Sequence, residues 1–144
     1  MPAFRIRTAT LADVPAMHAV RRAVRENALG DSGRITEASY SPFVDAGSIW
    51  VAEGPRGRIL GFAAVDQGDA SIWALFVDPS AEGAGVGRGL HDMTLVWARA
   101  AGLDHLRLTT APGTRAERFY LRAGWVRAGT SSTGEAAFGR GLDD

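Results

Sequence analysis

The stretch from Ser71 to Leu90, SIWALFVDPSAEGAGVGRGL, constrains this chain more than any other. Its first part, Ile72 to Val77, is apolar like a buried strand, and Pro79 ends the strand because proline has no N–H for a central ladder. The glycines at 83, 85, 87 and 89 let the backbone turn tightly and let a ligand approach it. Apolar residues then recur at helical spacing: Val86, Leu90, Met93 and Trp97. This order predicts free N–H groups at a helix N-terminus, where the helix dipole favours a phosphate.

Two common phosphate-binding motifs are excluded by the residues around these glycines. A P-loop requires a lysine after its last glycine, and the chain contains no lysine. The dinucleotide fingerprint GxGxxG requires a third glycine where this chain has Arg88 or Leu90. The stretch is therefore a phosphate-binding loop of another kind.

The letters V-D-P-S-A-E-G-A-G-V-G-R-G-L resemble the acetyl-CoA loop of the GCN5-related N-acetyltransferases (GNAT), V-x-P-x-x-(Gln/Arg)-G-x-G-x-(Gly/Ala)-x-x-L. Residues 108–125 resemble the other motif of that family, N-x-x-A-x-x-(Phe/Leu)-Y-x-x-x-G-(Phe/Trp). The matching residues are Ala116, Phe119, Tyr120, Gly124 and Trp125. The chain departs from the family pattern at Glu82, where Gln or Arg is preferred, and at Gly113, which replaces the asparagine. The resemblance spans nearly the whole chain and is strongest from Ile72 to Trp125.

This resemblance implies that acetyl-CoA is the cosubstrate and that the loop grips its pyrophosphate through backbone amides. The residues expected to contact the cofactor are Phe76, Val77, Glu82, Gly83, Ala84, Gly85, Val86, Gly87, Arg88, Gly113 and Tyr120. In relatives the strand equivalent to Ile72–Val77 splays from its parallel neighbour, and the pantetheine arm pairs with it like an added strand. A backbone N–H near Leu75 or Phe76 is expected to polarise the thioester carbonyl.

The implied reaction is transfer of an acetyl group to a primary amine of a small molecule, an amino acid or a peptide N-terminus. Tyr120 is the expected general acid, because a phenol with a pKa near 10 is protonated at neutral pH and can donate to a thiolate. The general base stays open, since no acidic residue lies between Ile72 and Val77. Asp69 is the nearest candidate, Glu37 and Asp66 are others, and ordered water is an alternative.

The acceptor is expected to contact Arg25, Asn27, Glu37 and Trp73, because acceptor specificity in relatives comes from the first two helices and their connection.

A second hypothesis is a CoA-binding module without turnover, a sensor or an interaction subunit. It is motivated by Glu82, by Gly113 and by the missing glutamate. The three histidines show no ligand spacing, so no metal site is expected.

Composition limits the remaining alternatives. A length of 144 residues predicts one domain. Sixteen basic and sixteen acidic residues cancel, which argues against a nucleic-acid or membrane partner and against aminoacyl-tRNA as the acceptor. The chain has no cysteine, no signal-peptide pattern and no apolar run near the roughly 20 residues of a membrane span, so we expect a cytoplasmic protein. The resemblance leaves a homodimer open.

The rest of the chain predicts an α/β fold with a mixed, mostly antiparallel sheet flanked by helices. Strands are expected at residues 4–8, 48–53, 58–66, 71–77, 105–110, 125–129 and 136–142. Helices are expected from Thr10 or Asp13 to Val24, from Thr36, after the glycine loop, and at residues 114–123. Strand 105–110 follows a strand–helix crossover, so it should run parallel to strand 71–77.

Overall fold

The computed structural model describes residues 3–25 and 35–142. The strands are β1 (Arg5–Thr8), β2 (Ile49–Glu53), β3 (Ile59–Asp66), β4 (Ser71–Val77), β5 (His105–Thr110), β6 (Val126–Thr130) and β7 (Ala136–Gly141). The helices are α1 (Val14–Arg25), α2 (Ser41–Ala46), α3 (Val86–Ala100) and α4 (Arg115–Arg122). The strands of the described residues form one sheet in the order β1-β2-β3-β4-β5-β7-β6, in which β4 and β5 are parallel and the other pairs are antiparallel. The predicted fold class is confirmed.

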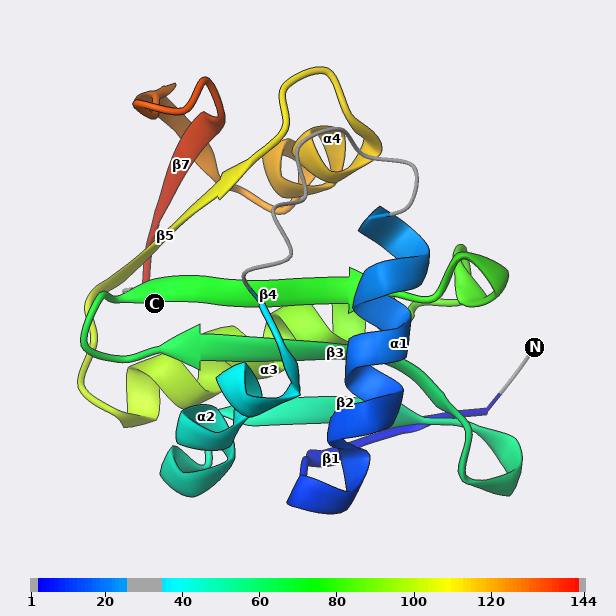
Figure 1. Ribbon diagram of the computed structural model, residues 1–144. Helices are drawn as coiled ribbons and strands as arrows, with labels where there is room; N and C mark the ends of the chain where they lie inside the picture. The colour runs from blue at the N-terminus through cyan, green and yellow to red at the C-terminus, as the bar shows by residue number, and fades with distance from the viewer. Residues whose placement is uncertain (1–2, 26–34, 143–144) are drawn as a thin grey trace.

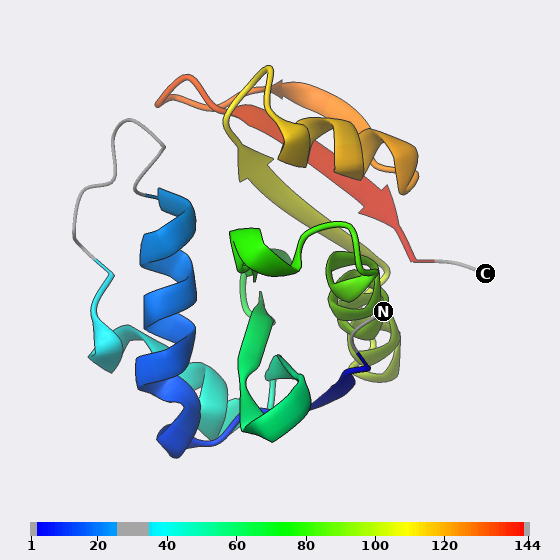
Figure 2. The same cartoon turned by 90° about the vertical axis from the view of Figure 1, so that its right-hand side faces the viewer.

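Helices cover both faces of the sheet (Figures 1 and 2). α1 and α2 lie on one face and α3 on the other. Successive side chains of β2 point to opposite faces of the sheet, so each layer of helices covers apolar residues of this strand. Ile49 and Val51 pack into the core beneath α1, while Trp50 and Ala52 pack into the core beneath α3. Because both faces are covered, β2 and β3 are apolar almost without interruption.

The two short helical segments near the N-terminus begin with side-chain caps. A 3-10 turn, Leu11–Asp13, precedes α1, and the Asp13 carboxylate accepts a hydrogen bond of 2.8 Å from the Thr10 N–H. Both residues offered as caps by the sequence therefore form one capping box. The helix expected from Thr36 is a 3-10 turn, Glu37–Tyr40, that continues into α2. Pro42 lies in the first turn of α2, where its missing N–H costs no hydrogen bond.

The parallel strands β4 and β5 separate almost immediately after they meet. Their register has a single pair, Ser71 with Arg107, whereas β3 follows β4 to its last residue, Val77. β5 pairs with β7 over its whole length instead. The splay expected for this strand pair is confirmed, and it leaves the far half of one β4 edge without a neighbouring strand (Figure 1).

A β-bulge in β4 lies at the point where the strands separate. Ile72 faces Val65 and Ala74 faces Ala64, so Trp73 is an extra residue in β4. Trp73 and Ala74 both contact the core beneath α1. The bulge thus turns an aromatic side chain towards α1 and α2.

No helix in the described part of the chain is both long and apolar enough to cross a membrane.

Candidate active site

The glycine loop joins β4 to α3 through a short turn capped by Asp78, whose carboxylate accepts a hydrogen bond of 2.9 Å from the Ser80 N–H. Gly83 and Gly85 have φ angles of 84° and 85°, a left-handed conformation that side chains with a Cβ adopt only with strain. The first hydrogen bond of α3 runs from Gly89 N–H to the Gly85 carbonyl, at 3.0 Å. The N–H groups at positions 86–88 consequently have no acceptor within the helix, as the sequence predicted.

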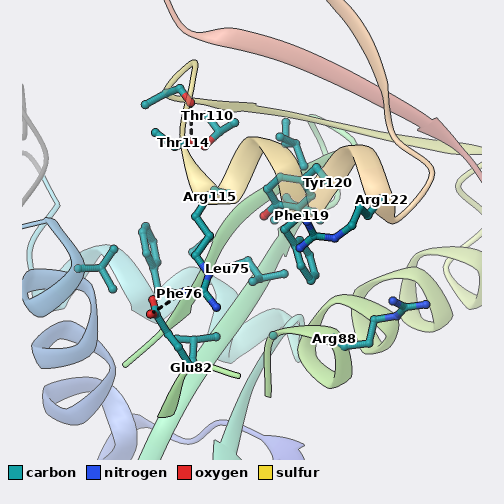
Figure 3. A pocket seen from close by; sticks show the side chains of 18 of the residues that line it. Leu75, Phe76, Glu82, Arg88, Thr110, Thr114, Arg115, Phe119, Tyr120 and Arg122 are labelled. Carbon is teal, nitrogen blue, oxygen red and sulfur yellow. Dashed lines mark hydrogen bonds and ion pairs between the residues drawn. The ribbon is translucent and has the colours of Figure 1, made fainter. Parts of the chain in front are cut away.

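A cavity of about 690 Å³ lies where β4 and β5 separate (Figure 3). Its walls come from β4, the glycine loop, the end of β5, α4, the end of α1 and the start of β7. Leu75 of β4 lies on the same side as Phe119 and Tyr120 of α4, while Phe76 lies on the side of α1, and all four line the cavity (Figure 3). An apolar channel therefore connects the free amides of the loop with the phenol predicted as the general acid.

Most of the predicted cofactor residues line this cavity: Phe76, Val77, Glu82, Gly83, Gly85, Gly87, Arg88 and Tyr120. Three do not. Ala84 stays outside the lining, and the Val86 side chain is buried in the core. The Gly113 N–H donates a hydrogen bond of 2.8 Å to the Glu117 carboxylate, so this amide already has an acceptor within the protein.

Tyr120 lies at the inner wall of the cavity with only 6% of its surface exposed. Its ring packs edge-on against Phe119 and Trp125, at centroid distances of 5.3 and 5.6 Å. Burial raises the pKa of its hydroxyl above the ordinary value for a phenol. The hydroxyl is therefore protonated at neutral pH, the state that a proton donor requires.

Three arginines line different parts of the cavity, Arg88 near the start of α3 and the other two at the ends of α4. Arg88, Arg115 and Arg122 all line the cavity (Figure 3). Arg115 and Arg122 are two helical turns apart and share one face of α4. The local charge is thus positive although the net charge is zero, which makes the cavity suitable for phosphate groups. The sequence motif did not reveal Arg115 or Arg122, because the family pattern leaves both positions unspecified.

Glu82 points towards Arg115. Its carboxylate forms an ion pair of 3.2 Å with Arg115, which connects the glycine loop to the first residue of α4 (Figure 3). Both side chains are partly exposed, so the pair contributes little to stability but occupies space that a phosphate could take.

The carboxylates predicted as bases are not brought to the cavity. Asp69 lies in the turn between β3 and β4, where its carboxylate bonds Arg107 at 2.6 Å. Asp66 accepts a hydrogen bond from the Asp69 N–H, and Glu37 is exposed at the start of its 3-10 turn. None of these three lines the cavity. The turn after β3 lies at the end where β4 and β5 are still paired, and there Asp69 bonds Arg107, the β5 residue that pairs with Ser71.

Glu135 is the carboxylate that sequence reasoning missed. It lines the cavity from the turn just before β7, and the Thr133 hydroxyl donates a hydrogen bond to it at 3.3 Å. No arginine or histidine of the described residues forms an ion pair with it. In the sequence it is part of a Ser/Thr/Gly segment that indicates only a turn.

The residues predicted to contact the acceptor lie in different places. Trp73 lines the cavity, and its ring stacks on Phe43 at 4.3 Å. The Arg21 guanidinium lies 5.0 Å from the Trp73 ring and 4.8 Å from that of Phe76, which fixes this wall. Asn27 lies outside the described residues, and Arg25 is the last residue of α1.

Among the described residues no group of three or more His, Asp or Glu side chains could hold a metal ion.

The sequence model of the acetyltransferase (GNAT) family matches residues 17–125. The chain belongs to this family. The chain is also similar to a mycothiol acetyltransferase of Sanguibacter keddieii, at 35% identity over 113 residues that make up 68% of this chain and 36% of that protein. The chain therefore spans about a third of the length of this relative.

Solved structures show the same fold. A GNAT acetyltransferase of Staphylococcus aureus Mu50 superposes with a TM-score of 0.83 at 15% identity, covering 98% of this chain and 100% of that one. An N-acetylglutamate synthase of Neisseria gonorrhoeae, complexed with coenzyme A and N-acetyl-glutamate, has a TM-score of 0.78 at 21% identity. That match covers 99% of this chain and 36% of the synthase.

Proposed function

We propose that this protein transfers the acetyl group of acetyl-CoA directly to a primary amine of a small molecule, an amino acid or a peptide N-terminus. One observation carries the proposal: the free amides of the glycine loop and the buried Tyr120 hydroxyl belong to the same cavity, between strands that separate. A thioester bound there supplies the acetyl group.

The residues present fit such a cosubstrate. The N–H groups at positions 86–88 and the guanidinium groups of Arg88, Arg115 and Arg122 suit its phosphates. The apolar wall of Leu75, Phe76 and Phe119 suits an extended pantetheine arm, and the open edge of β4 offers backbone groups for it to pair with.

Each further requirement of the reaction has a group in the cavity. Tyr120 holds the proton that the departing thiolate needs. A backbone N–H near Leu75 or Phe76 would stabilise the carbonyl oxygen as it gains charge. Glu135 lines the cavity and Asp69 does not, which supports Glu135 as the carboxylate that binds the incoming ammonium group and takes its proton, directly or through water.

The names of similar proteins support a small acceptor. One is a mycothiol acetyltransferase, and another is a synthase complexed with N-acetyl-glutamate, an acetylated amino acid. Trp73 and the end of α1 would form the acceptor side of the cavity, since Trp73 and Val24 both line it.

The alternative is a module that binds CoA without turnover, and the Glu82–Arg115 ion pair across the loop favours it. Release of free CoA thiol, measured with a thiol reagent across a panel of amines, separates the two. The chain has no cysteine, so the reagent reports only the released coenzyme. Acceptor-dependent thiol release supports the enzyme. Saturable acetyl-CoA binding with no release for any amine supports the module.

A further inference from the structure

His91 is a buried polar residue that the mechanism above does not use. It lies on the inner face of α3 with 2% of its surface exposed. The indole N–H of Trp125 donates a hydrogen bond of 2.9 Å to His91 Nε2. An indole nitrogen can only donate, so Nε2 must carry a lone pair. The contact therefore specifies an uncharged imidazole with its proton on Nδ1.

The other ring nitrogen also has a partner. His91 Nδ1 lies 3.0 Å from a carboxylate oxygen of Asp92, which can accept its proton in a hydrogen bond. Asp92 in turn lies 3.6 Å from the guanidinium of Arg88, and Arg88 lines the cavity (Figure 3). A series of contacts thus leads from the glycine loop, through His91, to Trp125.

Trp125 in turn supports the predicted proton donor. Its backbone N–H donates to the Tyr120 carbonyl at 3.0 Å, and its ring packs against the Tyr120 ring. The His91 ring also contacts Phe119 edge-on, at 5.6 Å, and lies 6.5 Å from the Tyr120 ring. The imidazole therefore joins α3 to three aromatic residues, of which Phe119 and Tyr120 line the cavity and Trp125 packs behind Tyr120.

We propose that His91 is a positioning residue for acetyl transfer: through Trp125 it holds the Tyr120 hydroxyl in place, and it does so only while uncharged. The proposal rests on the proposed function, in which Tyr120 donates the proton. Protonation would put a second N–H opposite the indole N–H, which removes the acceptor and breaks the contact.

Burial is the main reason that His91 stays neutral at neutral pH. Burial has the largest effect and lowers the pKa of the imidazole below its ordinary value near 6.5. Arg140 from β7 and Arg88 from α3 act in the same direction, while Asp92 opposes them. From α4, the facing titratable group is the neutral phenol of Tyr120. His91 therefore positions Tyr120 fully at neutral pH. This effect is lost as the pH falls through the lowered pKa of the imidazole.

Two substitutions at one site separate positioning from packing. In His91→Gln the amide oxygen can still accept the indole N–H but cannot be protonated, whereas His91→Leu fills the space without an acceptor. We expect kcat at neutral pH to stay close to wild type in the Gln variant and to fall roughly tenfold to a hundredfold in the Leu variant. The dissociation constant of acetyl-CoA should change little in either. Equal kcat values for the two variants overturn the proposal.

The pH profile gives a readout that packing alone would not move. The ratio of kcat for His91→Gln to kcat for wild type cancels acceptor ionisation, which is common to both. This ratio should be constant above the pKa of the His91 imidazole and should rise as the pH falls through that pKa. A ratio that stays constant through the measured pKa contradicts the proposal. If His91→Leu fails to fold, Trp125→Phe removes the same hydrogen bond and is expected to lower kcat in the same way.

An NMR measurement tests the proposal independently of turnover. Long-range ¹H–¹⁵N spectra of histidine-labelled protein, assigned with His91→Gln, report the tautomer and provide the pKa. The proton should be on Nδ1 at neutral pH. A proton on Nε2, or a charged ring at pH 7, overturns the proposal. Absence of turnover with every amine would refute the proposed enzyme and leave this test of His91 intact.

Discussion

Glu82 of the glycine loop and Arg115 of α4 form an ion pair of 3.2 Å across one end of the active-site cavity. The carboxylate stands where related loops prefer Gln or Arg, beside a guanidinium group that suits the phosphates of coenzyme A. We therefore expect the phosphates of coenzyme A to compete with the Glu82 carboxylate for Arg115.

Glu82→Gln is expected to tighten acetyl-CoA binding, because the substitution removes a negative charge and frees Arg115. An exposed pair is worth at most about 1 kcal/mol, so the dissociation constant should fall by up to roughly fivefold. Calorimetry at low salt measures it, and the gain should shrink at high salt. Asp69→Asn is the matched control, since it removes the carboxylate of an exposed Asp–Arg pair outside the cavity. Equal affinities for the two variants would exclude the competition.

Tyr120→Phe tests the proton donor. The substitution removes one oxygen atom from a packed ring, so stability and acetyl-CoA affinity should change little. We expect kcat to fall by about 10² to 10⁴, the usual contribution of a general acid. Because burial raises the pKa of Tyr120, the phenol keeps its proton and wild-type kcat should show no decline due to Tyr120 up to pH 10. An unchanged kcat in the Phe variant removes Tyr120 from the mechanism.

Glu135→Gln tests the acceptor side of the cavity. The neutral amide cannot attract an ammonium group or take its proton, so KM for the amine should rise and kcat/KM should fall by roughly tenfold or more. Acetyl-CoA affinity should stay at the wild-type value, in contrast to Glu82→Gln. Steady-state kinetics with the amine varied gives both parameters, and Asp69→Asn again serves as the control. Loss of activity in Asp69→Asn with none in Glu135→Gln would reverse the assignment.

Gly87→Ala should affect stability and binding in opposite directions. Gly87 is helical, and an added Cβ would lie 3.5 Å from Val77 and 3.9 Å from Phe119, which are ordinary contacts. The free energy of unfolding should therefore rise by up to about 1 kcal/mol, as alanine favours a helix. The same methyl group stands beside the free amides in the cavity, so acetyl-CoA affinity should fall.

Thermal unfolding and calorimetry on the same sample check both effects of Gly87→Ala. Gly68→Ala is the control for binding, because Gly68 lies in the turn after β3 and does not line the cavity. Tighter binding in Gly87→Ala would show that the coenzyme does not approach this end of α3.

The sequence predicted the parts of the site that depend on local order. A strand, a proline, spaced glycines and an amphipathic helix follow one another in the chain, and the loop with its free amides has the expected form. Tyr120 also lines the cavity, because helical periodicity decides which way its side chain points. Trp73 lines it as well, but its direction is set by the bulge in β4, which the sequence did not predict. The splay of β4 from β5 followed from the family resemblance and not from the residues of either strand.

The contacts that the sequence did not predict join residues far apart in the chain. Glu82 meets Arg115 33 positions later, and Trp125 reaches His91 over 34 positions. Glu135 lines the cavity only because β7 lies beside β5, which no local pattern indicates. Asp69 stands just before the central strand in the sequence, but its turn lies at the end where β4 and β5 are paired, and its carboxylate accepts a hydrogen bond from Arg107.

A crystal structure with acetyl-CoA bound tests the central claim most directly. The account predicts pyrophosphate oxygens within hydrogen-bond distance of the N–H groups at positions 86–88, the pantetheine arm along the open edge of β4, and the sulfur near the Tyr120 hydroxyl. A coenzyme bound outside the cavity between β4 and β5, or a sulfur remote from Tyr120, would contradict it.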